Sequence, residues 1–495
     1  MQSRRDQVQA HLFVMGRITS GMLRADPDAP ESPQGRTNRG AIAGIVVAVL
    51  LCAAAFIWGL ISPGRSNTWR DSQSLIVDQD TGASYLYVDG RLRPVRNYAS
   101  ARLIGGTKLT TRKVRNKSLA GAPHGQPVGI VGAPDSLPSP ADLSRDPWAV
   151  CSGTGAAGSV ATSTTLAVGA KTTGDAPLTA GEGMLVTGPG PDVYLVWQGS
   201  RLRLNQKGGA MSALGYAGQT VSPVSAAFLD ALPAGPDLTA PAVPGMGTAG
   251  PTLDGHATRI GQVFRVGVIG ADPHYYQLRQ NGLVRISVTV ADLLLGDPDV
   301  RRLAYGNRSA TATSLSADVL NTHLAPADQT SPPGAMPETP PRLVGRGTLQ
   351  SACVRVAPGG AGPRVSVVLA NPATLGLVAQ APTSAACVPV DRITTPPGGG
   401  VLVRALAADG GTGGATVYLV TDTGTKYRVP TSGDLAALGY SVGEAVALPS
   451  TLLAMLPAGP DLSSAAASGS ATPATPQPCG NTAQGGDKST TSHAR

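Results

Sequence analysis

Residues 40–61 read GAIAGIVVAVLLCAAAFIWGLI, a run of 22 residues without a charged side chain between Arg39 and Arg65. At the rise of an α-helix, a segment of this length spans roughly 33 Å, enough to cross a hydrocarbon core of about 30 Å. The sequence therefore predicts one transmembrane helix over residues 40–62. Its candidate membrane-embedded residues are Ile42, Val46, Leu50, Phe56 and Trp58.

A targeting signal would fit this apolar run less well than a membrane span. A cleaved signal peptide would have a shorter apolar region and a shorter leader than 39 residues. A lipoprotein signal would need a small residue before its cysteine, whereas Leu51 precedes Cys52. Residues 1–39 carry six arginines against four acidic residues. The positive-inside rule then places the N-terminus in the cytoplasm and the C-terminal region in the periplasm.

Composition limits what the region beyond the membrane can be. A chain of 495 residues is long enough for more than one domain. The net charge is +8, but charged residues make up only 14% of the chain and aromatic residues only 4%. Such a composition offers few stacking platforms for bases and argues against nucleic-acid binding. The 63 glycines and 42 prolines indicate many turns between short strands.

Internal repeats organise the region beyond the membrane. YLVWQGSRLRL begins at Tyr194 and YLVTDTGTKYRV at Tyr418, and both stretches continue to a shared PAGPDL element, 224 residues apart. A fainter pair relates Tyr85 to Tyr276, 191 residues on. In all four units a short apolar strand is followed by two alternating strands around a glycine turn, which predicts a hairpin.

A stretch with helical spacing follows each hairpin. In the last unit we expect a helical face formed by apolar residues, namely Leu435, Leu438, Val446, Leu448 and Leu452. The predicted fold is therefore α+β and rich in strands, with one transmembrane helix and an elongated periplasmic region. Four hairpin-plus-helix repeats surround a central domain made of two chain segments, because a module of some 50 residues buries little surface alone.

The predicted units follow one another along the chain. They are a cytoplasmic amphipathic helix and linker (1–39), the transmembrane helix (40–62), repeat 1 (70–135), the first part of the central domain (140–180), repeat 2 (181–240), repeat 3 (258–325), the second part of the central domain (340–395), repeat 4 (398–462) and a low-complexity tail (463–495). The order of the repeats implies the duplication of a unit of roughly 200 residues.

Cysteine placement suggests disulfides. Cys52 lies in the membrane segment, and the four other cysteines lie beyond it, an even number that suits an oxidising compartment. Cys151 and Cys353 occupy equivalent places in the two halves, and a bond between them would tie the central domain together. The alternative is that one of them pairs with Cys387, and Cys479 lies in the tail.

The N-terminal arm has helical periodicity. Over residues 6–23 apolar side chains recur every three or four positions, and the candidate docking residues are Val8, Leu12, Met15 and Ile18. The apolar face of this helix has no domain of its own to cover, so we expect it to dock on a cytoplasmic partner. The alternative is a helix that rests on the membrane surface.

No catalytic pattern is convincing. The nearest approach to a phosphate-binding loop, residues 480–489, has Asp487 where a glycine should precede the lysine, and it lies in the low-complexity tail. Residues 439–443 match the GxSxG pattern, but the equivalent stretch of repeat 2 lacks the serine. The six histidines show no metal-ligand spacing. We therefore expect no catalytic, cofactor-binding or metal site.

Three stretches together resemble one family. They are RDQVQAHLFVMGRITSGMLRADPDAPESP (5–33) before the membrane segment, then TGASYLYVDGRLRPVRNYASARLI (81–104) and VGIVGAPDSLP (128–138). With the single span and the four repeats, they are similar to EccB, a core membrane component of the type VII (ESX) secretion system of mycobacteria and related actinobacteria. The resemblance covers nearly the whole chain up to the tail.

The resemblance implies a structural role in the cell inner membrane. EccB-like proteins assemble with the EccC ATPase, EccD and EccE, and they pair as homodimers through the periplasmic region. Their repeats are similar to modules thought to bind cell wall. Some carry an ATPase label, which the absence of a phosphate-binding loop in this sequence does not support. The leading hypothesis is a scaffold of a secretion machine; the alternative is a stand-alone cell-wall-binding membrane protein or nucleotide hydrolase.

Overall fold

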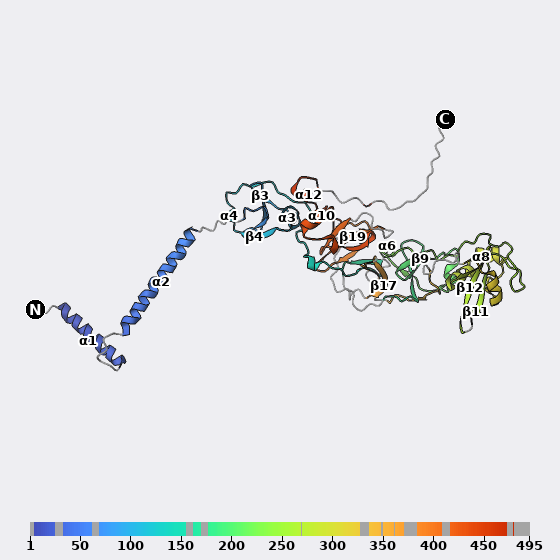
Figure 1. Ribbon diagram of the computed structural model, residues 1–495, viewed down its shortest axis with the longest axis horizontal. Coiled ribbons are helices and arrows are strands. Elements are labelled where there is room, and N and C mark those ends of the chain that lie inside the picture. Colours follow the sequence, from blue (N-terminus) through green and yellow to red (C-terminus); the bar gives the residue numbers. More distant parts are fainter. Residues whose placement is uncertain are drawn as a thin grey trace, which may run out of the picture.

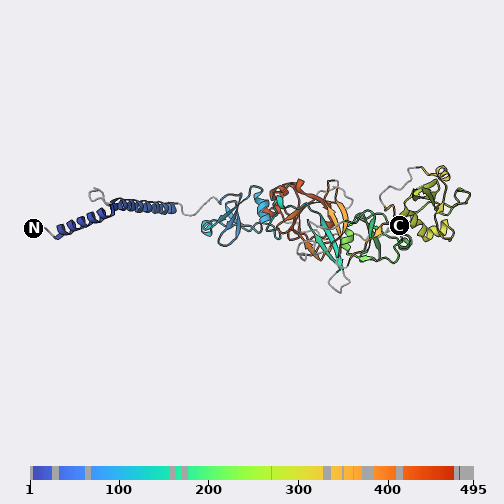
Figure 2. The ribbon, with the colours of Figure 1, turned by 90° about the horizontal axis from the view of Figure 1, so that it is seen from below.

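Two N-terminal helices precede a row of small sheets (Figure 1, Figure 2). The computed structural model describes residues 4–24, 33–61, 69–154, 162–169, 177–268, 270–326, 336–347, 350–360, 362–370, 384–407, 416–472 and 479. The helices are α1 (Arg4–Arg24) and α2 (Pro33–Ile61). Helix α2 begins at Pro33, ahead of the apolar run that starts at residue 40, because proline is tolerated in the first turn of a helix and no further proline follows within α2.

Repeat 1 shows the architecture of all four repeats. Its sheet has the order β3-β2-β1-β4, with β1 antiparallel to β2 and parallel to β4. Asp89 and Gly90 both have positive φ, as do Gln198 and Gly199 in repeat 2, which is the conformation that a two-residue hairpin turn requires. The elements are β1 (Ser74–Asp78), β2 (Ser84–Val88), β3 (Arg91–Pro94), α3 (Tyr98–Gly105), β4 (Thr110–Val114) and α4 (Asn116–Leu119).

The other three repeats have the same strand order. Repeat 2 contains β7 (Glu182–Thr187), β8 (Val193–Trp197), β9 (Ser200–Arg203), α5 (Ala210–Ala213), β10 (Ser222–Pro223) and α6 (Ala226–Asp230). Repeat 3 contains β11 (Val263–Val268), β12 (Ala271–Arg279), β13 (Gly282–Ile286), α7 (Val288–Gly296), α8 (Pro298–Ala304), β14 (Thr313–Ser314) and α9 (Ala317–His323). Repeat 4 contains β19 (Gly400–Leu406), β20 (Val417–Thr421), β21 (Lys426–Val429), α10 (Ser432–Leu438), the 3-10 turn η4 (Val442–Glu444), β22 (Val446–Pro449) and α11 (Ser450–Leu453).

The predicted helical face of repeat 4 is wrong in its second half. Gly439 ends α10 in the left-handed region, at φ +97°. Val446 and Leu448 then lie on strand β22, which pairs in parallel with β19, and Leu452 lies on the separate helix α11. Spacing alone cannot separate two short helices and a strand when their apolar residues happen to fall in one periodic series.

The PAGPDL element is structural in both copies. It runs parallel to the third strand, where Gly235 donates a backbone hydrogen bond to Arg201 and Gly459 donates one to Lys426. A Cβ on Gly459 would overlap the Tyr427 ring. The aspartate of the element pairs with the arginine of that strand, as Asp237 with Arg203 and Asp461 with Arg428.

The central sheet is built from both chain segments. Its order is β17-β16-β5-β6-β18, with β5 and β16 antiparallel at its centre. The strands are β5 (Trp148–Thr154), β6 (Thr162–Ala167), β16 (Ser351–Ala357), β17 (Arg364–Ala370) and β18 (Arg392–Thr394). The segment predicted to begin this domain at 340 first forms β15 (Arg342–Leu343), which instead extends the sheet of repeat 2 beside β7.

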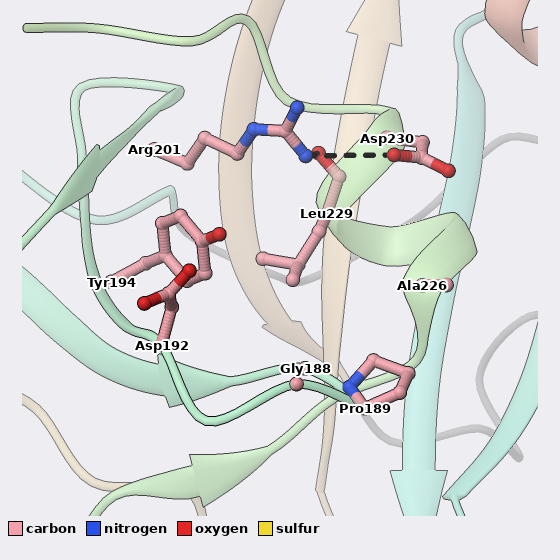
Figure 3. A pocket seen from close by; sticks show the side chains of 9 residues that line it. Gly188, Pro189, Asp192, Tyr194, Arg201, Ala226, Leu229 and Asp230 are labelled. Atoms are coloured by element: carbon pink, nitrogen blue, oxygen red, sulfur yellow. Dashed lines mark hydrogen bonds and ion pairs between the residues drawn. The ribbon is translucent and has the colours of Figure 1, made fainter. Parts of the chain in front are cut away.

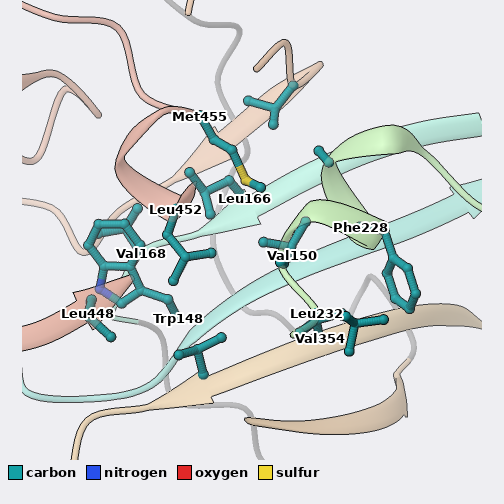
Figure 4. Packing of buried hydrophobic residues seen from close by; sticks show 14 of the residues in the cluster. Trp148, Val150, Leu166, Val168, Phe228, Leu232, Val354, Leu448, Leu452 and Met455 are labelled. Carbon is teal, nitrogen blue, oxygen red and sulfur yellow. The ribbon is translucent and has the colours of Figure 1, made fainter. Parts of the chain in front are cut away.

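One face of the central sheet carries the main core (Figure 4). Trp148, Val150 and Val354 point into it, since alternate residues of a strand share a face. Phe228 from repeat 2 and Leu452 from repeat 4 complete the same cluster, and both are fully buried. These two residues are 224 apart, so the duplicated repeats supply equivalent side chains to one core.

The repeats form a row through the body. Repeats 2 and 4 pack on the central sheet, while repeats 1 and 3 lie at the ends (Figure 1). Leu103 and Ile130 of repeat 1 share a core with Leu402 and Leu438 of repeat 4. Helix α7 of repeat 3 packs against α5 of repeat 2, where Leu293 enters the core.

Residues 463–468, which the sequence assigns to the tail, are part of the fold. They form α12 (Ser464–Ser468), and its buried Ala466 and Ala467 pack with α3. Asp434 of repeat 4 accepts a hydrogen bond of 2.7 Å from the Ser464 amide. Burial acts to raise the pKa of Asp434, but hydrogen bonds from Ser464 and Thr431 hold the pKa below its ordinary value. The carboxylate therefore fastens α12 to repeat 4.

Replacing Ala454 by Asp should stabilise repeat 4. The Lys426 ammonium donates to the Leu453 carbonyl, and burial lowers its pKa to about 8. In repeat 2 the corresponding Arg201 donates to the Leu229 carbonyl and also pairs with Asp230 at 3.5 Å, whereas alanine takes that place in repeat 4. A carboxylate at position 454 should contribute about 0.5–1 kcal/mol at neutral pH.

The pH dependence provides the measurement. Because the folded pKa of Lys426 is lowered, the unfolded chain binds more protons between pH 8 and 10.5, and stability rises with pH across that window. In the Ala454→Asp variant, the protection of residues 446–459 against hydrogen exchange should increase less steeply with pH across that window. Ala454→Asn, of similar size but uncharged, is the control, and equal profiles for the two variants would contradict the prediction.

Candidate functional site

Helix α2 has the length and composition of a membrane span. The candidate membrane span within it, Thr37–Trp58, is 22 residues long, and none of these residues is buried within the chain. The five predicted membrane residues are all exposed on this helix, namely Ile42, Val46, Leu50, Phe56 and Trp58. Exposure of so many large apolar side chains is stable in hydrocarbon and costly in water.

Helix α1 presents an uncovered apolar surface. Val8, Leu12, Met15 and Ile18 lie on it, and Leu12 is 66% exposed. Phe13 and Val14 are exposed as well. The three-to-four periodicity did not select these two, because they fall outside the predicted stripe. An apolar surface of this kind marks a contact with a partner or with a membrane.

The two cysteines at equivalent places are joined in the middle of the body. Cys353 on β16 lies directly opposite Cys151 on β5, and a disulfide links them. Both are buried, at 0% and 3% exposure, on the face of the sheet opposite the main core. The bond therefore ties together two chain segments separated by 202 residues, at the junction of the two halves.

Two buried tyrosines, at equivalent positions of repeats 2 and 4, make equivalent contacts. The Tyr440 hydroxyl of repeat 4 donates to the Pro138 carbonyl at 2.6 Å, and the Tyr216 hydroxyl of repeat 2 donates to the Pro341 carbonyl at 3.0 Å. Burial raises the pKa of both phenols, so they stay protonated as donors. The tyrosine that ends each Leu-Gly-Tyr stretch, residues 214–216 and 438–440, thus fastens the segment that leads into the central sheet.

A second disulfide joins Cys387 to Cys479, two residues that sequence reasoning did not pair. Both lie exposed at the surface. The bond therefore brings Cys479 back, across a separation of 92 residues, to the segment that leads into β18. Composition could not reveal this pairing, since the tail around Cys479 has no apolar pattern. Cys52, on α2, is a free thiol.

A small cavity opens beside repeat 2 (Figure 3). Its volume is about 220 Å³, and its polar lining includes Asp192, Tyr194, Arg201 and Asp230. Arg201 is already engaged there, since its guanidinium donates to the Leu229 carbonyl at 2.6 Å and pairs with Asp230. The guanidinium of this cavity is therefore taken up by contacts within repeat 2.

The described residues hold no cluster of three metal-ligating side chains. The GxSxG stretch is explained by a turn, because the Ser441 amide donates to Glu444 at 2.6 Å and caps η4. The stretch 480–489, which approaches a phosphate-binding loop, lies outside the described residues. The main features of the described structure are thus a candidate membrane helix, an N-terminal helix with an uncovered apolar surface and a body joined by disulfides.

Comparison with known proteins agrees with this picture. A family model described as "Type VII secretion system ESX-1, transport TM domain B" matches residues 1–473. The ESX-3 secretion system ATPase EccB3 of Mycolicibacterium smegmatis (strain ATCC 700084 / mc(2)155) is 29% identical over 475 residues, covering 93% of this chain and 89% of that protein.

Solved structures extend the likeness to three dimensions. A chain of an intact ESX-5 inner membrane complex matches with a TM-score of 0.65 and 25% identity, covering 98% of each chain. The EccB3 dimer from the ESX-3 core complex matches with a TM-score of 0.65 and 26% identity, covering 79% of this chain and 99% of that one. On the family match, which spans residues 1–473, the chain belongs to the EccB family of type VII secretion system membrane proteins.

Proposed function

We propose that this chain is a structural membrane component of a type VII (ESX) secretion machine, joining its cytoplasmic and periplasmic parts. In this proposal α1 lies in the cytoplasm, α2 crosses the inner membrane and the disulfide-linked body lies in the periplasm. Two disulfides in the body suit an oxidising compartment, which supports this orientation. Relatives found in an inner membrane complex and as a dimer support the assembly.

The observation that carries the proposal is the uncovered surface of α1. A helix of 21 residues that keeps Leu12 and Met15 exposed gains little from packing within its own chain. We infer that cytoplasmic parts of the complex, formed by proteins like EccC, EccD and EccE, cover this surface. We also propose that the body pairs with a second copy, and the EccB3 dimer found in the ESX-3 core complex supports this pairing.

Introducing charge into α1 should release the partners. In the double variant Leu12→Glu, Met15→Glu, each carboxylate would have to be buried unpaired in the contact, so we expect at least about tenfold less co-purified complex. The measurement is a mild-detergent pull-down of the full chain, followed by quantitative mass spectrometry. The same experiment tests the proposed function, because a wild-type chain recovered alone would favour a stand-alone membrane protein.

The control places the same charge elsewhere on the helix. Gln9→Glu and Ala10→Glu together add two carboxylates to α1 away from the stripe of Val8, Leu12, Met15 and Ile18. This variant should keep its partners. Equal loss of partners by both double variants would argue that α1 senses charge at the membrane surface instead of docking through its apolar residues.

Relatives carry the word ATPase in their names, yet we propose that this chain acts without hydrolysing nucleotide itself. The support is the sequence at 480–489, where Asp487 replaces the glycine that a phosphate-binding loop needs before its lysine. The purified full chain should release no phosphate from ATP above a Lys488→Ala control. Phosphate release that this substitution abolishes would overturn the point.

A further inference from the structure

Strand β4 of repeat 1 forms a positively charged edge. It is the outermost strand of its sheet, on the side of β1 that faces away from the hairpin. Residues 106–119, which comprise the turn before β4, the strand itself and the following helix α4, carry five cations and no carboxylate. All five side chains are exposed. The basic edge consists of Lys108, Arg112, Lys113, Arg115 and Lys117.

The other repeats show that the fold does not require these charges. Repeat 1 (70–135) holds ten lysines and arginines against five acidic residues, whereas repeat 2 holds three against four and repeat 4 three against five. The equivalent fourth strands β10, β14 and β22 contain no charged residue. The cations of β4 are therefore specific to the repeat that follows α2, because the fourth strand forms without charged residues in the other repeats.

Neighbouring acids do not cancel the basic edge. Asp78 accepts hydrogen bonds from Thr81 and from the Asp80 amide, which hold its pKa low. Asp80 accepts from the Asn116 amide, and Asp71 from Ser74 and the Gln73 amide. Within the described part of the chain, no carboxylate oxygen lies within ion-pair distance of the five cations. A positive field remains at this edge.

The membrane lies within reach of this field. Only seven residues separate Ile61, the last residue of α2, from Trp69, which packs in the core of repeat 1. Seven residues span at most roughly 25 Å, so repeat 1 stays close to the bilayer surface. Helix α4, at the end of the basic edge, lies at the end of the body nearest α2 (Figure 1).

We propose that the basic edge of repeat 1 binds the anionic headgroups of the lipid leaflet from which α2 emerges. Lysine and arginine hydrogen-bond and pair with phosphodiester groups, and an anionic leaflet attracts clustered cations close to its surface. Repeat 1 is then held against the membrane by charge as well as by its tether. This contact sets the angle at which the row of repeats leaves the bilayer.

The test uses the full chain in vesicles. A fluorescent label on Thr111→Cys, in a Cys52→Ala background with both disulfides intact, reports quenching by lipids that carry a spin label on the headgroup. Vesicles of phosphatidylcholine alone are compared with vesicles of equal parts phosphatidylcholine and phosphatidylglycerol. We expect strong quenching only in the anionic vesicles, lost when salt is raised from about 0.05 M to about 0.5 M.

Matched variants separate local from overall charge. The basic-edge variant should lower the ratio of docked to undocked repeat 1 on the order of tenfold or more. It combines Lys108→Gln, Lys113→Gln, Arg115→Gln and Lys117→Gln. Arg112 is kept because its Nε donates to Ser74 at 3.0 Å. The control removes four exposed cations elsewhere and should leave quenching unchanged. It consists of Lys207→Gln, Arg301→Gln, Arg308→Gln and Arg392→Gln.

Three results would overturn the proposal. They are equal quenching in the two kinds of vesicle, quenching that salt leaves unchanged, and equal loss in the basic-edge variant and its control. Equal quenching in the two lipids would show that the short connection to α2 alone, and not lipid charge, keeps repeat 1 near the bilayer. Because the assay contains no other secretion component, its outcome is separate from that of the pull-down that tests the proposed function.

Discussion

Replacing both Cys151 and Cys353 by Ala should destabilise the central sheet by about 4–5 kcal/mol. The bond closes a loop of 202 residues, and in the entropic account its stabilising effect grows with the length of the loop. It also joins β5 to β16, the antiparallel pair at the centre of the sheet where the two chain segments meet.

Hydrogen exchange of β5 and β16 measures the effect. Their amides should exchange far faster in the double variant, while those of repeat 3 should change little. Cys52→Ala, which removes a cysteine that forms no disulfide, is the control. Unchanged protection of β5 and β16 in Cys151→Ala, Cys353→Ala would show that packing alone holds the sheet together.

The two disulfides should also differ in the order in which they open. Cys387 and Cys479 are exposed, whereas Cys151 and Cys353 are buried. Thiol–disulfide exchange needs access to a sulfur atom, so a mild reductant should free Cys387 and Cys479 first. Alkylation and peptide mapping against time would report the order, and early labelling of Cys151 would contradict it.

Phe228→Ala should be the next most costly change, at about 3–5 kcal/mol. Phe228 lies on α6 of repeat 2, is fully buried, and packs with Val354 and Leu232 in the core that repeat 2 shares with the central sheet (Figure 4). Removing its ring leaves a cavity that the sheet cannot fill, because β5 and β16 are held in register by the disulfide. Repeat 2 should then separate from the sheet more easily.

Limited proteolysis and thermal unfolding of the full chain would measure this loss. Cleavage between residues 231 and 260 should become faster, since local opening exposes the connection that follows α6. Leu324→Ala, which truncates a side chain that is 49% exposed, is the control and should change stability little. A Phe228→Ala chain as stable as this control would show that repeat 2 does not depend on the shared core.

Local patterns predicted the pieces of this fold better than their assembly. The hairpin of repeat 2 was readable from Gln198 and Gly199, because a tight turn and alternating strands leave a strong period. Strands β10 and β14 were not, since two residues give no period at all. The pairing of repeat 1 with repeat 4 rests on side chains such as Leu103 and Leu438, which are far apart in sequence.

The candidate site was predictable to a similar extent. The apolar run marked the membrane helix, although not the polar turns that α2 adds before it, because hydropathy does not report helix length. The duplication suggested a bond between Cys151 and Cys353, since equivalent positions of two halves meet at their junction. No repeat or periodic pattern pointed to the bond between Cys387 and Cys479 or to the basic edge. The proposed role of the basic edge depends on its distance from the membrane.

The contact between repeats 1 and 4 has a consequence for how the protein is made. Arg102 of repeat 1 donates to the Leu438 carbonyl of repeat 4, across 336 residues of chain. At a synthesis rate of about 5–20 residues per second, repeat 1 emerges roughly twenty seconds to a minute before its partner. Throughout that interval Leu103 and Ile130 lack the cover that repeat 4 gives them. Chains that end before repeat 4 lack Leu402 and Leu438, so they leave this apolar surface of repeat 1 exposed to water.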